Sequence, residues 1–143
     1  MMEKEMVPLA IVDALGVVKG KTRFQKLLYI YQSESGRSAR AKNQFAFELY
    51  HYGPFSFELE TTLDRLSEMS LLRVTTTLTS EGHALYLYQL TREGRQLLRQ
   101  GRNLGWLSRQ ADHNLREVAE TYGGMQLRKL VEEAYARFEG TGR

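Results

Sequence analysis

Two short segments with β-forming residues, 71–79 and 84–90, stand in a chain whose remaining pattern is mostly helical. Segment 71–79 is rich in β-branched side chains, and segment 84–90 alternates apolar and polar side chains; both patterns are typical of strands. Only four residues join the two segments, and the glycine among them, Gly82, suits a hairpin loop. The sequence therefore predicts an antiparallel hairpin, and with it a fold that combines helices with a sheet.

Helices are predicted on both sides of this hairpin because apolar side chains recur there every three or four residues. The expected helices cover residues 6–15, 22–36, 56–70 and 92–100, and two further helices follow between residues 107 and 138. Ser56 and Thr91 are expected to cap the third and fourth helices. Gly94 is expected to keep the first turn of the fourth helix close to the sheet.

Three local signals predict how the first three helices are joined. Thr22 and Gln25 have the spacing of a capping box, in which each side chain accepts a hydrogen bond from the other residue's backbone. Residues 45–49 alternate like a short strand. Gly53 and Pro54 indicate a turn before the third helix.

The order of these elements is that of a winged helix-turn-helix. We therefore predict an α+β fold, mainly α, with a β-hairpin wing and two extra C-terminal helices. A loose joint at residues 101–105 divides the expected winged-helix domain, 1–103, from a C-terminal helical extension, 104–143, packed on it.

One of Gly123 and Gly124 is expected to end a helix in the left-handed conformation. Homodimerisation through the C-terminal helices is a hypothesis, since they carry much apolar surface.

Several stretches resemble known families. The segment YQLTREGRQLL (88–98) resembles the strand-to-helix exit of bacterial winged-helix regulators. The segments TRFQKLLYIYQ (22–32), FELYHYGPFSFELETTLDRLSEMSLL (47–72) and ETYGGMQLRKLVEEAYARF (120–138) resemble the YwgA-like proteins and, more distantly, the antitoxin-type SocA or Panacea domain. The resemblance to the SocA or Panacea domain implies toxin neutralisation and, in one branch, delivery of a toxin to a protease. Neither resemblance brings catalytic residues with it.

Composition excludes several classes of chemistry. The 143 residues include no cysteine, which excludes disulfides, thiol nucleophiles and cysteine-ligated metals. The three histidines lack the i,i+4 spacing of a metal pair, and the loop from Gly16 to Gly20 has one residue too few for a phosphate loop. We therefore expect no enzyme activity and no cofactor. No apolar run reaches the length of a membrane span, so a cytoplasmic protein without a membrane partner is expected.

Positive charge is concentrated in residues 19–42, although the whole chain carries a net charge of only +3. This segment holds seven basic residues against one acid. Such a cluster predicts contacts with the phosphates of DNA, and the first hypothesis is therefore a DNA-associated transcriptional regulator. The predicted nucleic-acid contacts are Lys19, Lys21, Arg23, Lys26, Arg37, Arg40 and Lys42. A second cluster, residues 92–102, is interpreted as a solvated face.

A protein-interaction module of antitoxin or adaptor type is the alternative hypothesis. The third helix, which enters the major groove in the usual winged-helix docking, is acidic here, and the wing tip carries no lysine or arginine. An acidic helix and a neighbouring aromatic segment suit a protein partner better than a phosphate backbone. Phe57 is nevertheless expected to begin a buried stripe. The predicted partner contacts are Tyr50, His51, Tyr52, Phe55, Glu58, Glu60, Asp64 and Arg65.

Overall fold

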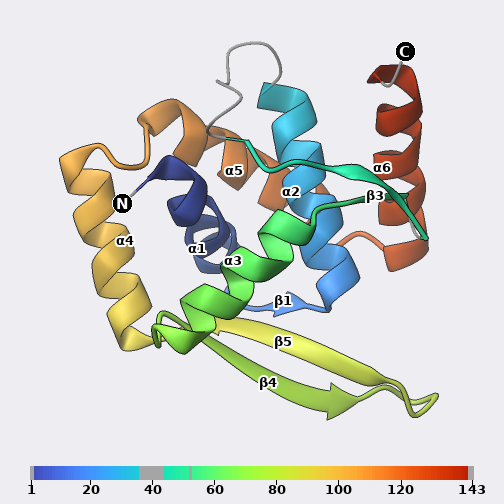
Figure 1. Ribbon diagram of the computed structural model, residues 1–143, viewed down its shortest axis with the longest axis horizontal. Helices are drawn as coiled ribbons and strands as arrows, with labels where there is room; N and C mark the ends of the chain where they lie inside the picture. The colour runs from blue at the N-terminus through green and yellow to red at the C-terminus, as the bar shows by residue number, and fades with distance from the viewer. Residues whose placement is uncertain (1, 36–43, 52, 142–143) are drawn as a thin grey trace.

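The computed structural model describes residues 2–35, 44–51 and 53–141 (Figure 1). The chain begins with α1 (Glu3–Leu15), β1 (Val18–Lys19) and α2 (Lys21–Ser35). A small hairpin, β2 (Glu48–Tyr50) and β3 (Gly53–Phe55), precedes α3 (Phe57–Glu68). The elements that follow are β4 (Leu72–Leu78), β5 (Ala84–Leu90), α4 (Arg92–Leu104), α5 (Arg109–Tyr122) and α6 (Leu127–Thr141).

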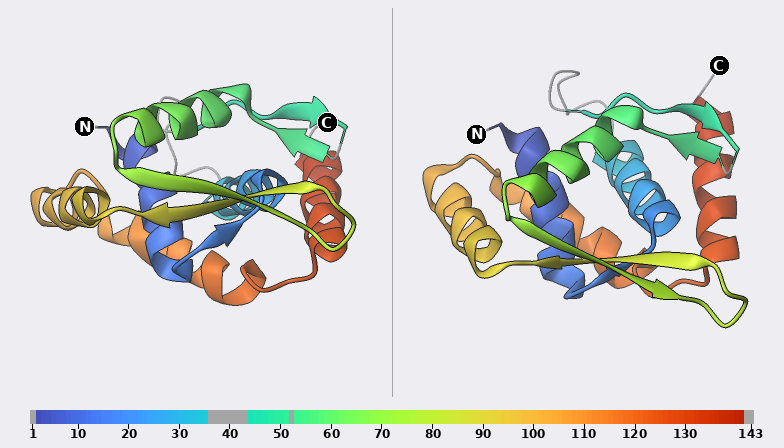
Figure 2. Two further views of the ribbon diagram at one scale, coloured as in Figure 1. Left: turned by 90° about the horizontal axis from the view of Figure 1, so that it is seen from below. Right: turned by 60° about the horizontal axis from the view of Figure 1, so that its bottom comes forward.

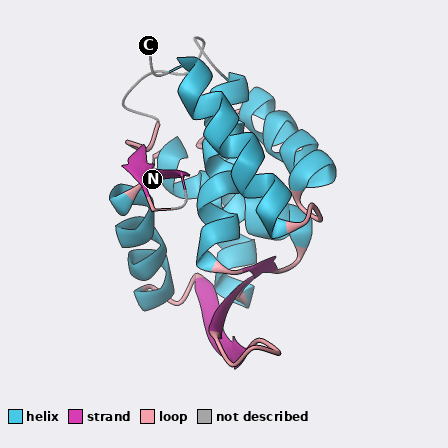
Figure 3. Ribbon diagram, turned by 90° about the vertical axis from the view of Figure 1, so that its right-hand side faces the viewer, coloured by secondary structure: helices cyan, strands magenta, loops and turns pink. Residues whose placement is uncertain are grey.

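The predicted α+β fold with a winged-helix layout is confirmed. Strands β4 and β5 form the predicted antiparallel hairpin, with Val74 opposite Tyr88 and Leu78 opposite Ala84. Strand β1 pairs with the other edge of β5, which gives the strand order β1-β5-β4. Helices α1, α2 and α3 and this three-stranded sheet form the winged-helix part, and the hairpin β2–β3 is inserted between α2 and α3. The two hairpins lie at different ends of the helical body (Figure 3).

Helix α1 lies at the centre of the molecule. All seven residues from 6 to 12 are buried, so this helix is apolar around its whole circumference rather than along one stripe. It packs against α4, α5 and β5 (Figure 1). Helix α2 turns its apolar side chains into the same core. There the ring of Phe24 contacts the ring of Tyr88 of β5 edge to face, with 5.0 Å between the ring centroids. Helices α5 and α6 pack on α2 and close the core.

The predicted caps of α3 and α4 are confirmed. The Ser56 hydroxyl accepts a hydrogen bond from the Leu59 amide at 3.0 Å. The Thr91 hydroxyl accepts one from the Gly94 amide at 2.9 Å and donates to the Ser70 carbonyl at 2.6 Å. Gly94 lies so close to the Leu71 carbonyl that a Cβ atom would collide with it. The turn from the wing into α4 is therefore fixed by the Thr91 hydroxyl and by the absence of a side chain at Gly94.

The start of α2 differs from its prediction. Residues 18–19, between the first two predicted helices, form the short strand β1, which was not predicted. The capping box of Thr22 with Gln25 is wrong, since α2 begins one residue earlier, at Lys21. The Gln25 side chain is buried and bonds to the backbone of Ser56, so it serves a tertiary contact rather than a local one.

Four further segments differ from their predictions. Gly53 and Pro54 form strand β3 and not a turn. Residues 45–47 lie outside the strand that was expected at 45–49, which spans 48–50. The expected joint at 101–105 is helical up to Leu104, with the left-handed residue at Gly105. Neither Gly123 nor Gly124 has a positive φ, because the α5 helix ends there in ordinary helical geometry. Among the described residues, no helix combines the length and apolar character needed to cross a membrane.

Candidate functional site

A group of aromatic rings, three of them exposed and one half-buried, lies where the hairpin β2–β3 meets α3. We call it the aromatic surface: Tyr50, His51, Phe55 and Phe57. The rings contact one another, with centroid distances of 5.5 Å for Tyr50–Phe55, 5.4 Å for Tyr50–Phe57 and 4.9 Å for Phe55–Phe57. Tyr50 and Phe57 are each 48% exposed. The predicted burial of Phe57 is wrong: as the first residue of α3 it points outward, and the buried stripe of that helix starts at Leu59.

Two buried side chains of α2 hold this surface in place. The Gln25 amide accepts a hydrogen bond from the Ser56 N–H at 2.8 Å and donates one to the Ser56 carbonyl at 2.9 Å. The Lys26 ammonium donates to the Pro54 carbonyl at 2.8 Å. Because both acceptor carbonyls belong to residues between Gly53 and Phe57, α2 fixes the backbone that carries the rings.

Lys26 is therefore not available for contact with a nucleic acid. The residue is only 1% exposed, and burial lowers the pKa of its ammonium from 10.5 to about 8. A lysine surrounded by apolar groups favours the neutral form, since the charged form loses its hydration. The prediction that Lys26 binds phosphate is contradicted by its position, and its role is to anchor strand β3.

The lowered pKa makes stability depend on pH. Between pH 8 and 10 the unfolded chain keeps a charged Lys26 while the folded chain has released that proton, so the free energy of unfolding rises with pH. We expect a gain of about 1–2 kcal/mol from pH 7 to pH 9.5. Above pH 10 the buried Tyr31, whose pKa burial raises to about 12, opposes this trend. Urea denaturation at the two pH values measures the gain, and Lys26→Met should abolish it. An equal gain in Lys26→Met would contradict this assignment.

Of the other predicted nucleic-acid contacts that the structure describes, Arg23 and Lys21 have partners within the fold. Arg23 donates to the backbone carbonyls of Gly123 and Met125 at 3.2 and 2.7 Å, and burial lowers its pKa. Lys21 pairs with Glu60 at 3.5 Å and lies 4.4 Å from the ring centre of Tyr86. Lys19 is exposed on β1. The remaining three members of the set, Arg37, Arg40 and Lys42, lie outside the described residues.

The acidic residues of α3 follow Phe57 along the helix. Glu58 binds Lys4 at 2.7 Å, and this contact together with the Ala46 amide lowers the pKa of its carboxyl group. Asp64 and Arg65 are exposed further along the helix. Tyr52 lies outside the described residues. The structure thus places the described aromatic members of the predicted partner-binding set together, with the acidic ones on the adjoining helix.

Sequence reasoning missed Gln25 and Phe57. Gln25 carries no signal of its tertiary partner, because its spacing from Thr22 fits a local cap equally well. The signal for Phe57 was its place directly after the Ser56 cap, since the buried stripe of α3 begins two residues later, at Leu59.

No protein-family model matches the chain, and no curated protein matches it either. Within the ranges that the structure describes, no group of three or more histidine and carboxylate side chains could hold a metal ion. The function must therefore be argued from the surfaces of the molecule.

Proposed function

We propose that this protein is a non-enzymatic protein-interaction module of adaptor or antitoxin type, which binds a partner protein through the aromatic surface. The observation that carries the proposal is that the four rings form one contiguous group where the hairpin meets α3, with Tyr50, His51 and Phe57 exposed and Phe55 half-buried. Contiguous exposed apolar surface typically marks an interaction site. Aromatic anchors supply most of the binding energy in such interfaces.

The charges around the rings favour one kind of partner. Glu48 lies two residues before Tyr50 on the same strand, and Asp64 follows Phe57 along α3. Glu60, between Phe57 and Asp64 on the helix, is paired with Lys21 at 3.5 Å. A second copy of this chain would bring the same carboxylates together, and a nucleic acid would bring phosphates to them; both arrangements are repulsive. The occupant that complements this surface is a protein segment with apolar and basic side chains. The resemblance to the Panacea domain agrees with such a role.

A photo-crosslinking residue at position 57 tests the proposal inside the cell of origin. The side chain at this position is half exposed, so replacing Phe57 leaves the core intact. We expect a discrete adduct between this protein and one partner protein after irradiation. Glu48→Lys combined with Asp64→Lys should weaken that adduct at least about tenfold, because two exposed carboxylates that attract a basic segment are replaced by like charges.

The matched control carries the same crosslinking residue at Leu78, which is more exposed but lies near the tip of the wing. It should give no adduct of the same mass. An identical adduct from position 78 would contradict the proposal, as would an adduct of position 57 with a second copy of this chain or with nucleic acid.

A further inference from the structure

The outward face of α4 carries three arginines along one line. Arg92, Arg95 and Arg99 are separated by three and four residues, the spacing that places side chains on one side of a helix. All three are exposed, while Gly94, Leu98 and Gly101 are buried on the opposite side. Three exposed positions between and beyond the arginines carry amide side chains, Gln96, Gln100 and Asn103, while the exposed Glu93 is acidic and the exposed Leu104 is apolar.

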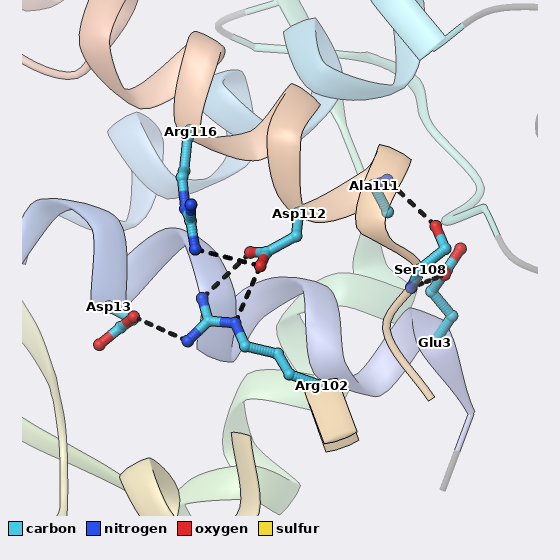
Figure 4. A network of polar contacts seen from close by, with 7 residues as sticks. All are labelled: Glu3, Asp13, Arg102, Ser108, Ala111, Asp112 and Arg116. Atoms are coloured by element: carbon cyan, nitrogen blue, oxygen red, sulfur yellow. Dashed lines mark hydrogen bonds and ion pairs between the residues drawn. The ribbon is translucent and has the colours of Figure 1, made fainter. Parts of the chain in front are cut away.

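The charge on this face is not neutralised by the protein. Among the described residues, Arg92, Arg95 and Arg99 take part in no ion pair, and the guanidinium of Arg95 bonds only to the Leu90 carbonyl, at 3.3 Å. Arg102 of the same helix shows the contrast. It binds Asp112 at 2.9 Å and Asp13 at 3.2 Å and so joins α4 to α5 and α1 (Figure 4). Arg102, which connects three helices, is paired with carboxylates, whereas the three arginines on the outward face are exposed to solvent.

Helix α4 forms a ridge at the side of the molecule (Figure 2). Its main contacts are with α1 and β5, on its inner side. Its 13 residues make a helix about 20 Å long. The major groove of duplex DNA, about 12 Å wide, accepts one α-helix. The outward face therefore has the width, the charge and the donor side chains of a helix that binds DNA.

We propose that α4 is a DNA-binding helix, in which Arg92, Arg95 and Arg99 contact phosphates. This goes beyond the protein-binding role of the aromatic surface and does not depend on it. This arrangement differs from the usual docking of a winged helix, in which the acidic α3 would face the phosphates. Helix α4 carries only one acidic residue, Glu93. Arginine and glutamine are the side chains that donate to phosphates and base edges.

Fluorescence anisotropy of a labelled random-sequence duplex tests this proposal. With three phosphate contacts, the logarithm of the affinity should fall with a slope of about −2.7 against the logarithm of the salt concentration. The affinity should then fall about 40-fold between ~50 and ~200 mM salt. Arg92→Glu with Arg99→Glu removes two contacts. It should weaken binding at ~50 mM at least about tenfold and reduce the slope by about 1.8.

The matched control is Lys19→Glu with Lys129→Glu, which makes the same change in net charge at two exposed lysines on β1 and α6. We expect this variant to bind DNA within about threefold of the unmodified protein. Three results would overturn the proposal. They are an absence of binding at ~50 mM salt, an equal loss of affinity in the control, and equally strong binding of the α4 face to a polyglutamate chain, which would assign it to acidic proteins instead.

Discussion

Gly94→Ala is expected to lower the free energy of unfolding by about 3 kcal/mol or more. The added Cβ would collide with the carbonyl oxygen of Leu71, and this oxygen belongs to the backbone at the start of the wing. The same carbonyl accepts hydrogen bonds from the Thr91 backbone at 3.2 Å and the Thr91 hydroxyl at 3.1 Å. Relief of the collision requires α4 to move away from β4, which breaks the Thr91 cap. Urea denaturation followed by circular dichroism measures the loss.

Gly140→Ala is the matched control. It makes the same substitution inside helix α6, where nothing lies within 4 Å of the new Cβ. Because alanine favours the helical conformation over glycine, this variant should gain up to about 1 kcal/mol. A Gly94→Ala protein as stable as the unmodified chain would show that α4 is not held against the wing by close packing.

Gln25→Ala is expected to cost about 2–4 kcal/mol, because it leaves the buried N–H and carbonyl of Ser56 without their partners. Gln25 is 2% exposed, so water cannot easily replace the lost amide. The effect should concentrate where α3 begins. Hydrogen exchange of the Ser56 amide should become much faster, while the amides of β4 and β5 should change only with global stability.

Gln96→Ala provides the comparison for this experiment, since Gln96 is exposed on α4 and should change stability by less than about 0.5 kcal/mol. If Gln25→Ala lost stability without faster exchange at Ser56, the amide pair would not be what holds the start of α3. Loss of crosslinking from position 57 in a folded Gln25→Ala protein would connect this buried contact to the aromatic surface.

Periodicity and capping residues predicted most of the fold. The wing was predicted within a residue or two because its strands differ in pattern from the flanking helices and a four-residue loop joins them. Thr91 and Ser56 were predictable as caps because a hydroxyl at that position bonds to an amide only three residues away. The close approach of Gly94 to the sheet was also predictable, because Gly94 lies in the first turn of a helix that directly follows a strand.

Contacts between distant residues explain what could not be predicted. Lys26 resembles the exposed Lys19 and Lys21 in the sequence, and its burial depends on the carbonyl of Pro54, which belongs to a separate strand. Arg23 likewise belongs to a basic segment but bonds to carbonyls about a hundred residues later in the chain. The aromatic segment of the candidate surface was predicted from the sequence. The exposure of Phe57 was not, because it depends on the orientation of α3, which the Gln25–Ser56 contact fixes.

The central position of α1 has a consequence for how the chain is made. Helix α1 is synthesised well before its packing partner α5, which begins only at Arg109. Until that segment has been synthesised, the apolar circumference of residues 6–12 lacks a large part of its cover. A nascent chain at this stage exposes the kind of surface that chaperones bind and proteases cleave. We expect co-translational folding to finish late, with α5 as the step that buries the first helix.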